Sequence, residues 1–371
     1  MEKVDIAIIG AGIIGLSAAY TLSDGEKEII VVERNESFGQ ETSSRNSEVI
    51  HSGIYYPKDS FKAKCCIRGR HLLYDLCGKH GIPHKKLGKL LVACDKKEVD
   101  KLEDIYQNAL DCGLDNLRFL EKKEIREFEP NVDAQKALLC PDTGIIDSHS
   151  AMDFFFRSAK SKKVDFAFGI NVIGIKKLSS SYELTVEEPG GEHFTFEAGS
   201  VINAAGLESN KVSELVGIDS KSNSYTIHYC KGQYFRIRNP KQYNITHPVY
   251  PPPTDIDLGI HLTPDLAGGL RLGPDANYVD TLDYDINEVD KEIFCNSVKR
   301  FLRPLKKDDL MPDTAGIRPK LQTENESFRD FVISNEEDKG FPNFINLIGI
   351  ESPGLTSCLA IAENVKNLLK S

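Results

Sequence analysis

The sequence predicts an α/β (α+β) fold in which a Rossmann-like domain is joined to a domain built on a mixed antiparallel β-sheet. Three observations support this prediction: a strand–turn–helix–strand unit in residues 1–33, buried apolar strands that recur near residues 200 and 346, and a β-rich stretch over residues 225–280. The chain has 371 residues, more than one hydrophobic core usually supports, so two domains are expected.

The N-terminal unit follows from its apolar pattern. Val4–Ile9 is a short apolar run followed at once by glycine, which predicts a buried strand. Ile13–Ser23 is expected to form a helix and Glu28–Glu33 a second strand. Together these segments make one βαβ unit of about the size that such a unit requires.

A glycine motif, GAGIIG, lies between the first strand and the helix. In this GxGxxG pattern, Gly10 permits a tight turn, Gly12 lets a pyrophosphate approach the backbone, and Gly15 lets the helix pack against the sheet. The helix N-terminus offers free N–H groups to the phosphates. Glu33 ends the second strand, where a carboxylate accepts hydrogen bonds from ribose hydroxyls and disfavours a 2′-phosphate. The unit therefore predicts a bound dinucleotide.

The rest of the chain alternates helices and strands. Further helices are expected at Phe61–His80, Glu98–Asp111, Ser150–Ser161, Asn287–Phe301 and Leu355–Leu369. Further strands are expected at Lys89–Ala93, Ser200–Asn203 and Phe344–Ile348, with a three-stranded antiparallel meander over Asp165–Glu197. Strands typical of the nucleotide fold thus occur at the start, near residue 200 and at the end of the chain. They predict a discontinuous cofactor-binding domain (residues 1–84, 141–220 and 312–371) and a substrate-binding domain (residues 85–140 and 221–311).

Composition narrows the class of protein. The net charge of −10 argues against nucleic-acid binding. Nine cysteines without a CxxC pair predict reduced thiols in a cytoplasmic protein, without a metal or iron–sulfur site. No apolar run approaches the roughly 18 residues of a membrane span, and no export signal precedes the first strand.

Several segments resemble one family. The segment TSSRNSEVIHSGIYY, residues 42–56, resembles the flavin-side loop of the D-amino-acid oxidase superfamily, and within it that of the L-2-hydroxyglutarate dehydrogenases. Segments similar to the same family follow in the family's order at Gly88–Leu90, His261–Pro264 with Leu272–Pro274, Gly316–Lys320 and Glu351–Thr356.

Two turns indicate that the dinucleotide is FAD. Asn203–Gly206 resembles the second FAD-contact segment of large flavoproteins, and Gly349–Thr356 resembles the turn whose backbone meets the flavin ring or the ribityl chain. No histidine or cysteine clearly calls for a covalent flavin bond, so non-covalent FAD is expected. The expected FAD contacts are Gly10, Gly12, Ile13, Ile14, Gly15, Glu33, Arg34, Thr42, Ser43, Ser44, Asn46, Val172, Ala204, Ala205, Gly206, Gly316, Ser352, Pro353, Gly354, Leu355 and Thr356.

The resemblance implies oxidation of L-2-hydroxyglutarate to 2-oxoglutarate, with reoxidation by a quinone, an electron-transfer protein or oxygen. It also implies peripheral contact with the inner face of the cytoplasmic membrane. Two alternatives stay open: a related enzyme acting on glycerol 3-phosphate or an amino acid, and a non-catalytic FAD-binding interaction protein.

A 2-hydroxy acid requires a clamp for its carboxylate, a base for its hydroxyl proton and a hydride acceptor. Arg318 is the expected clamp, since a guanidinium grips a carboxylate with two parallel hydrogen bonds and the matching arginine of the superfamily binds the substrate carboxylate. His51 is the expected base, because an imidazole titrates near neutrality. His261 is the alternative base or a second polar contact.

The second carboxylate of the substrate needs its own partner. The candidates, unranked by the sequence, are Lys89, Tyr55, Tyr56, Lys231 and Arg271. The expected substrate-binding set is His51, Tyr55, Tyr56, Lys89, His261 and Arg318.

Overall fold

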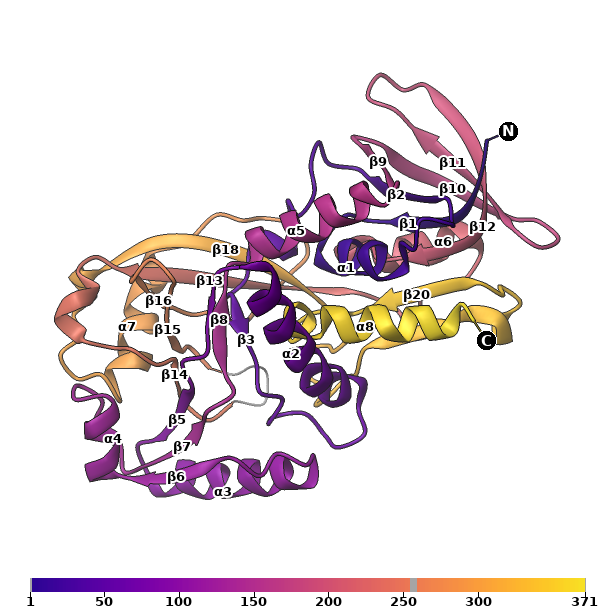
Figure 1. Ribbon diagram of the computed structural model, residues 1–371. Helices are drawn as coiled ribbons and strands as arrows, with labels where there is room; N and C mark the ends of the chain where they lie inside the picture. Colours follow the sequence, from indigo (N-terminus) through magenta and orange to yellow (C-terminus); the bar gives the residue numbers. More distant parts are fainter. Residues whose placement is uncertain (1, 254–258, 371) are drawn as a thin grey trace.

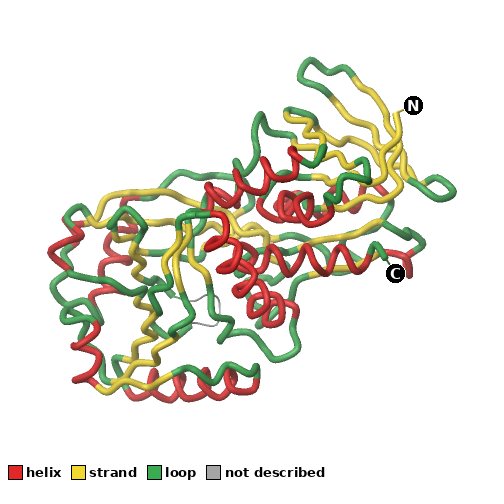
Figure 2. Tube along the Cα trace, in the orientation of Figure 1, coloured by secondary structure: helices red, strands yellow, loops and turns green. Residues whose placement is uncertain are grey.

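Two large β-sheets dominate the molecule. The computed structural model describes residues 2–253 and 259–370, and it places an eight-stranded sheet at one end and a nine-stranded sheet at the other (Figure 1). Helices α2 (Phe61–His80) and α8 (Gly354–Leu368) lie in the middle of the molecule (Figure 2). This arrangement confirms the predicted α/β class.

The eight-stranded sheet has a parallel centre. Strand β1 (Glu2–Ile9) lies between β2 (Ile29–Glu33) and β12 (His193–Asn203), and β9 (Asp165–Phe168) and β20 (Phe344–Ile348) continue the parallel pairing outward. The antiparallel strands of this sheet are β10 (Asn171–Lys177), β11 (Tyr182–Glu187) and β19 (Val332–Asn335). The apolar strands predicted at the start, near residue 200 and at the end of the chain therefore meet in one sheet.

The predicted three-stranded meander over Asp165–Glu197 is partly wrong. Its first strand, β9, pairs in parallel with β2, because helix α5 (Ser148–Ser161) precedes it and returns the chain to that edge. The antiparallel unit consists instead of β10, β11 and β12. Strand β12 is continuous, so the predicted strand Ser200–Asn203 is only its C-terminal part. The alternation of apolar residues does not reveal whether a strand's partner is parallel or antiparallel.

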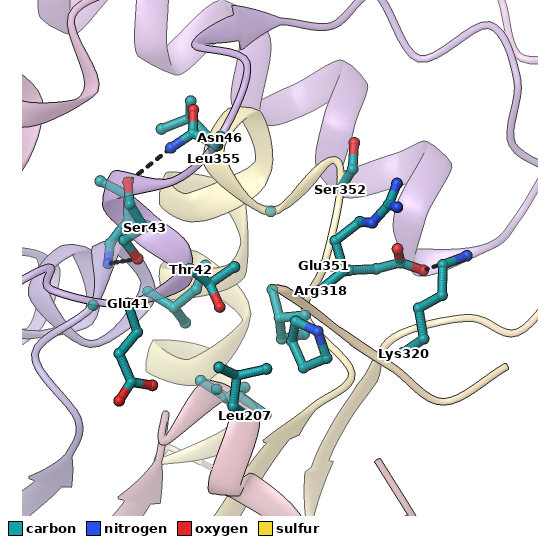
Figure 3. Close-up of a pocket in the computed structure, with 18 of the residues that line it drawn as sticks. Glu41, Thr42, Ser43, Asn46, Leu207, Arg318, Lys320, Glu351, Ser352 and Leu355 are labelled. Atoms are coloured by element: carbon teal, nitrogen blue, oxygen red, sulfur yellow. Dashed lines mark hydrogen bonds and ion pairs between the residues drawn. The ribbon is translucent and has the colours of Figure 1, made fainter. Parts of the chain in front are cut away.

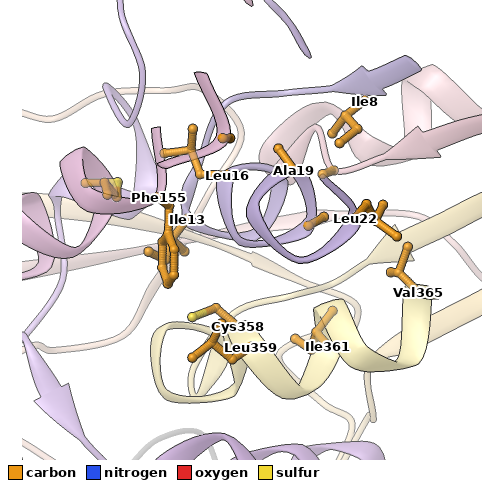
Figure 4. Packing of buried hydrophobic residues seen from close by; sticks show 14 of the residues in the cluster. Ile8, Ile13, Leu16, Ala19, Leu22, Phe155, Cys358, Leu359, Ile361 and Val365 are labelled. Atoms are coloured by element: carbon orange, nitrogen blue, oxygen red, sulfur yellow. The ribbon is translucent and has the colours of Figure 1, made fainter. Parts of the chain in front are cut away.

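Helices cover both faces of this sheet. Helix α1 (Ile13–Leu22) packs between α5 and α8, and its Ala19 lies next to Ile8 of β1 (Figure 4). Helix α6 (Ser209–Val216) covers the opposite face. Because α1 is enclosed on all sides, it is apolar around its circumference. This packing fixes the start of α1 at the carboxyl ends of the parallel strands.

A buried polar network joins β12 to β20 beneath the Ala204–Gly206 turn. The Asn203 amide donates to Asn346 Oδ1 at 2.8 Å, and the Asn346 amide donates to Glu336 Oε1 at 2.9 Å. The Tyr225 hydroxyl donates to the same Glu336 oxygen at 2.9 Å. The side chains of Asn203, Asn346 and Glu336 are all fully buried.

We expect Asn346→Leu to lower the free energy of unfolding by about 1–3 kcal/mol, because it removes one buried acceptor of the Asn203 amide and one donor to the buried Glu336 carboxylate. Chemical denaturation of the purified protein measures this loss. The exposed Asn367→Leu on α8 is the matched control, with an expected change within about 0.5 kcal/mol. Equal effects of the two substitutions would show that the network contributes no stability.

The nine-stranded sheet forms the other end of the molecule. Its long central pair is β13 (His228–Ile237) and β18 (Leu310–Lys320). The other strands are β17 (Asn277–Val279), β16 (Leu270–Leu272), β15 (Leu262–Pro264), β14 (Val249–Tyr250), β5 (Lys89–Ala93), β7 (Lys136–Cys140) and β6 (Arg118–Glu121). Helices α3 (Lys96–Asp111), α4 (Lys122–Phe128) and α7 (Lys291–Lys299) flank it. A small third sheet contains β3 (Val49–Ile50), β8 (Gly144–Ile146) and β4 (His84–Lys85).

Some helices begin at residues other than those predicted, and in two of them a capping side chain explains the difference. Helix α3 begins two residues before the predicted Glu98, because Asp95 accepts a hydrogen bond from the Glu98 backbone and caps the helix. Helix α5 likewise begins at Ser148, after the capping Asp147. The helix predicted over Asn287–Phe301 is shorter, since a 3₁₀ turn precedes α7.

The two-domain division stays a prediction, and its boundary at residue 312 falls inside strand β18. This strand pairs with β13 in the nine-stranded sheet along its whole length. Within residues 2–253 and 259–370, none of the helices combines the length and apolar character of a bilayer crossing.

Candidate active site

One cavity of about 1060 Å³ runs from the glycine turn of the parallel sheet to strand β18 of the other sheet. This volume lies just above the range of about 300–1,000 Å³ for ligand pockets, so it has room for a dinucleotide and a small substrate. Most predicted site residues line it: Gly10, Gly12, Ile13, Ile14, Glu33, Arg34, Thr42, Ser43, Asn46, His51, Tyr55, Tyr56, Val172, Ala204, Ala205, Gly206, His261, Arg318, Ser352, Pro353, Gly354 and Leu355.

The glycine turn has the backbone that the motif requires. Gly10 has φ +104°, and a Cβ there would lie 2.6 Å from the Ala204 carbonyl oxygen. Gly12 is the N-cap of α1 and supplies no side-chain cap, so the first turn of the helix opens on the cavity. The Ser43 hydroxyl accepts from the Ile13 N–H at 2.9 Å, which leaves its own proton available to a ligand.

The Glu33 carboxylate is fixed in the cavity wall. Its Oε2 accepts from the Ala11 N–H at 2.7 Å, and its Oε1 accepts from the Asn35 N–H at 2.9 Å. Arg34 beside it forms an ion pair with Glu41. The predicted ribose-binding carboxylate is therefore held at the end of β2, next to the glycine turn.

The flavin-side loop closes one side of the cavity. Thr42 Oγ1 donates to the Ile317 carbonyl at 2.9 Å, and the Asn46 amide donates to the Ser43 carbonyl at 2.7 Å. Figure 3 shows Glu41, Thr42, Ser43 and Asn46 on one side of the cavity, and Arg318, Lys320, Glu351 and Ser352 on the other. The Thr42 hydrogen bond ties this loop to strand β18.

Arg318 reaches the cavity from strand β18, where it lies opposite Cys230 of β13. One of its terminal nitrogens donates to the Asp275 carbonyl at 2.6 Å and contacts the Cys230 sulfur at 3.3 Å. These contacts with the backbone and a thiol fix the guanidinium plane at the end of the cavity.

Three charged side chains adjoin Arg318. Lys62 Nζ lies 2.9 Å from Glu351 Oε1, and Lys320 Nζ lies 3.8 Å from the same oxygen, with all three side chains nearly buried. Burial acts to raise the pKa of Glu351, but Lys62, Lys320 and Arg318 outweigh it and hold this pKa below its usual value. The Glu351 carboxylate is therefore ionised, and it forms ion pairs with Lys62 and Lys320.

His51 lies just after β3, and its backbone is fixed by α8. The His51 N–H donates to Thr356 Oγ1 at 3.0 Å. Among the described residues its ring nitrogen Nδ1 is shut off from solvent without a partner, whereas Nε2 lies 3.4 Å from the Ser352 hydroxyl. Burial, with smaller effects from Lys89 and His261, lowers the pKa of His51 to about 3. The imidazole is thus neutral at physiological pH.

His261 lies directly before β15 and is held by two contacts. Its Nδ1 lies 2.9 Å from the Gly259 carbonyl, and its ring stacks on Tyr250 with centroids 3.7 Å apart. Burial lowers the pKa of His261 to about 3, with smaller contributions from Lys89 and Arg318. The Nδ1 contact fixes the ring's orientation.

Four residues predicted to contact FAD do not line the cavity. A Cβ at Gly15 would lie 1.9 Å from the Gly10 carbonyl oxygen, and one at Gly316 would lie 2.1 Å from that of Arg45, so both glycines permit close backbone packing. Ser44 uses its hydroxyl on the Glu41 carbonyl. Thr356 is fully buried, and its hydroxyl holds the His51 loop.

Three of the candidate partners for a second carboxylate also lie off the cavity wall. Lys231 forms an ion pair with Asp283 at 2.7 Å, and Arg271 pairs with Asp313. Lys89 is fully buried behind Tyr55. Of the five candidates, only Tyr55 and Tyr56 line the cavity.

The sequence reasoning missed several lining residues, including Arg45, Lys62, Lys320 and Glu351. Lys320 and Glu351 stand inside segments that carry the family resemblance, so their position was a usable signal. Lys62 lies in a predicted helix that carries other charged residues. A lysine in such a helix is usually on the face exposed to solvent. No pattern in the sequence marks it as a buried cation.

The residues of the cavity fit FAD. The N-termini of α1 and α8 both open on it, and the N–H groups of their first turns that have no partner within the helix could bind phosphate and flavin oxygens. Gly12 leaves the backbone accessible, and Val172, Leu207 and Leu355 supply apolar walls. Among the described residues, no group of three or more histidine, cysteine, aspartate or glutamate side chains is placed to hold a metal ion.

The Rossmann-like sheet, the uncapped helix ends and the buried polar residues at the far end define a dinucleotide-dependent oxidoreductase. Comparison with known proteins identifies the family, because a model described as "FAD dependent oxidoreductase" matches residues 5–368. The chain belongs to this family of FAD-dependent oxidoreductases, and FAD is its cofactor. The interpretation as a non-catalytic FAD-binding protein is not supported.

Two curated relatives and one solved structure are similar over nearly the whole chain. The mitochondrial L-2-hydroxyglutarate dehydrogenase of Arabidopsis thaliana is 38% identical, over 99% of this chain and 83% of the relative. A glycerol 3-phosphate dehydrogenase of Caloramator mitchellensis is 28% identical, over 99% and 74%. The FAD-bound L-alpha-glycerophosphate oxidase of Mycoplasma pneumoniae has a TM-score of 0.89 at 27% identity, over 100% of this chain and 96% of that one.

Proposed function

We propose that this protein oxidises L-2-hydroxyglutarate to 2-oxoglutarate. The observation that carries the proposal is that Arg318 and His51 line the same cavity as the glycine turn, in a chain 38% identical to an L-2-hydroxyglutarate dehydrogenase. FAD supplies an acceptor that takes the α-hydrogen of a hydroxy acid as hydride.

Arg318 binds the carboxylate next to the reacting carbon. Its guanidinium is oriented by the Asp275 carbonyl and the Cys230 thiol, so little side-chain freedom is lost when a carboxylate binds. Two parallel hydrogen bonds then fix the orientation of the substrate as well as its position. A substrate held in this way would keep one orientation while its α-hydrogen is removed.

His51 accepts the hydroxyl proton. Its Nδ1 is sealed from solvent, which leaves Nε2 as the nitrogen that can meet a substrate. The low pKa of about 3 guarantees the neutral form, and the charge of a bound anion raises the basicity of the ring when the substrate arrives. His261 is the second polar contact to the substrate, since its Nδ1 faces the Gly259 carbonyl.

The acceptor that reoxidises the flavin is proposed to be a quinone, an electron-transfer protein or oxygen. The location in the cytoplasm and the peripheral contact with its membrane stay predictions. The predicted division into a cofactor-binding and a substrate-binding domain is best placed after Lys320, which keeps strand β18 whole.

Glycerol 3-phosphate is the second candidate substrate. Lys62, Lys320 and Arg318 gather at the same end of the cavity, and such a set of cations suits a phosphate. An amino acid is less suited, because the buried carboxylate of Glu351, which could pair with a substrate ammonium, already pairs with Lys62.

Steady-state turnover with an artificial electron acceptor tests the proposal. We expect L-2-hydroxyglutarate to give a kcat/KM at least about 100-fold above that of glycerol 3-phosphate, its own D-enantiomer or an L-amino acid. Formation of 2-oxoglutarate is measured in the same samples. A higher kcat/KM with glycerol 3-phosphate would replace the main proposal with the second candidate.

A further inference from the structure

We propose that Tyr55 and Lys89 together form the subsite for the second carboxylate of the substrate, and that this pair selects dicarboxylates over monocarboxylates. The inference rests on the proposed function, and it concerns the residues of the same cavity that determine which substrates are accepted. Its basis is a buried cation that has no carboxylate partner among residues 2–253 and 259–370.

Lys89 is the first residue of β5 and is fully buried. Its Nζ lies 4.4 Å from the centroid of the Tyr55 ring and 4.7 Å from that of Tyr250. Within the described part of the chain no carboxylate lies within ion-pair distance of this ammonium. A buried ammonium without a carboxylate is costly for folding, and an apolar side chain of similar length would pack there without that cost. The cation is therefore better explained by binding than by stability.

Tyr55 connects this cation to the cavity. Lys89 Nζ donates to the Tyr55 hydroxyl oxygen at 2.8 Å, and Tyr55 lines the cavity wall. Because the oxygen already accepts from Lys89, the hydroxyl proton must point to another acceptor. No acceptor for it occurs in the described residues, so a ligand in the cavity is the natural partner. A carboxylate there would receive a hydrogen bond strengthened by the lysine charge.

The position of the pair suits the second carboxylate rather than the first. Tyr55 belongs to the loop that follows β3, whereas Arg318 reaches the cavity from β18. His51 and His261 line the same cavity as Tyr55 and Arg318. A substrate with two carboxylates can engage Arg318 with one and Tyr55 with the other, while its hydroxyl lies among the imidazoles.

Tyr55→Phe and Lys89→Met test the subsite in the FAD-loaded enzyme. The first removes the hydroxyl that accepts from Lys89, and the second replaces the buried charge with an apolar chain of similar length, so Lys89→Met tests the subsite without leaving an unpaired ammonium. The matched control is Lys86→Met, since Lys86 is 53% exposed and pairs with Asp142 outside the cavity. The substrates are L-2-hydroxyglutarate and (S)-2-hydroxyvalerate, which has the same carbon chain without the second carboxylate.

We expect each variant to lower the ratio of kcat/KM for the dicarboxylate over the monocarboxylate by about 10- to 100-fold, with the value for (S)-2-hydroxyvalerate changed by less than about 3-fold. Lys86→Met leaves the ratio unchanged. Equal losses with both substrates, or an unchanged ratio, would overturn the proposal. A melting temperature of Lys89→Met well below that of the wild type would also overturn it, because it would assign the lysine a structural role.

Glutarate binding separates this inference from the proposed function. Glutarate carries both carboxylates but no hydroxyl, and its binding is measured from the change in the flavin absorption spectrum. We expect its Kd to rise about 10- to 100-fold in Tyr55→Phe and Lys89→Met. Wild-type enzyme that fails to oxidise L-2-hydroxyglutarate would refute the proposed function, while unchanged glutarate affinity in the variants would refute the subsite.

The pH dependence gives a second readout. Burial lowers the pKa of Lys89 to about 8, so its charge is lost as the pH rises through that value. The groups near Lys89 are the Tyr55 hydroxyl, the Tyr250 ring, the imidazoles of His51 and His261, and the thiols of Cys66 and Cys140. Both imidazoles stay neutral over this range. Selectivity for the dicarboxylate should fall above about pH 8 in the wild type and stay flat in Lys89→Met; a flat wild-type profile would contradict the assignment.

Discussion

Replacing Arg318 with alanine is expected to lower kcat/KM for L-2-hydroxyglutarate by about 100- to 10,000-fold, the cost of truncating one partner of a buried charged pair. Arg318→Lys should recover only part of this loss, because an ammonium cannot form two parallel hydrogen bonds with a carboxylate. The FAD content should stay at the wild-type level, since the glycine turn lies at the other end of the cavity. Steady-state kinetics and the flavin absorption spectrum measure the two effects.

The matched control is Arg236→Lys on strand β13. The side chain of Arg236 is 41% exposed and pairs with Asp313 outside the cavity, so turnover should change by less than about 3-fold. If Arg318→Ala kept kcat/KM within that same range, Arg318 could not be the clamp.

His51→Gln is expected to lower kcat by about 100- to 10,000-fold, because the hydroxyl proton loses its acceptor. The wild-type kcat/KM should show no acid limb near the usual imidazole pKa of about 6.5, since His51 in the free protein has a pKa of about 3. A pH profile of both enzymes measures these effects. An acid limb near pH 6.5 that disappears in His51→Gln would show that the imidazole titrates normally, and it would contradict the lowered pKa of His51.

The same histidine links stability to pH. Its pKa is lower in the folded chain than in the unfolded chain, so the unfolded chain takes up the proton first as the pH falls below about 6.5. Folding stability is therefore lost on acidification, by up to about 1.4 kcal/mol per pH unit from this group. His51→Gln should reduce that slope, which denaturation curves at several pH values can measure.

The cofactor half of the site could be predicted from sequence because local patterns determine it. The Gly10–Gly15 turn, the acid at Glu33 and the turn at Asn203–Gly206 each depend on residues close together in the chain, and the parallel strands bring them to one edge of a sheet. The strand partner of β9 could not be predicted in this way, since a crossover helix decides it.

The substrate half could be predicted only in part. The resemblance to a family pointed to Arg318 and His51. Lys62 and Glu351 are 289 residues apart in the sequence, so no local pattern of residues predicts their ion pair. Lys89, Lys231 and Arg271 looked equivalent as sequence candidates. The structure separates them, because Lys231 and Arg271 have carboxylate partners, whereas among the described residues Lys89 donates to the Tyr55 hydroxyl and has no carboxylate partner.

Anaerobic titration of the FAD-loaded protein with L-2-hydroxyglutarate tests the central claim most directly. We expect the oxidised-flavin absorption band to be bleached with one 2-oxoglutarate formed per flavin, and glycerol 3-phosphate at the same concentration to leave the band unchanged. An intact band after addition of L-2-hydroxyglutarate, in protein whose flavin is readily reduced by dithionite, would contradict the account.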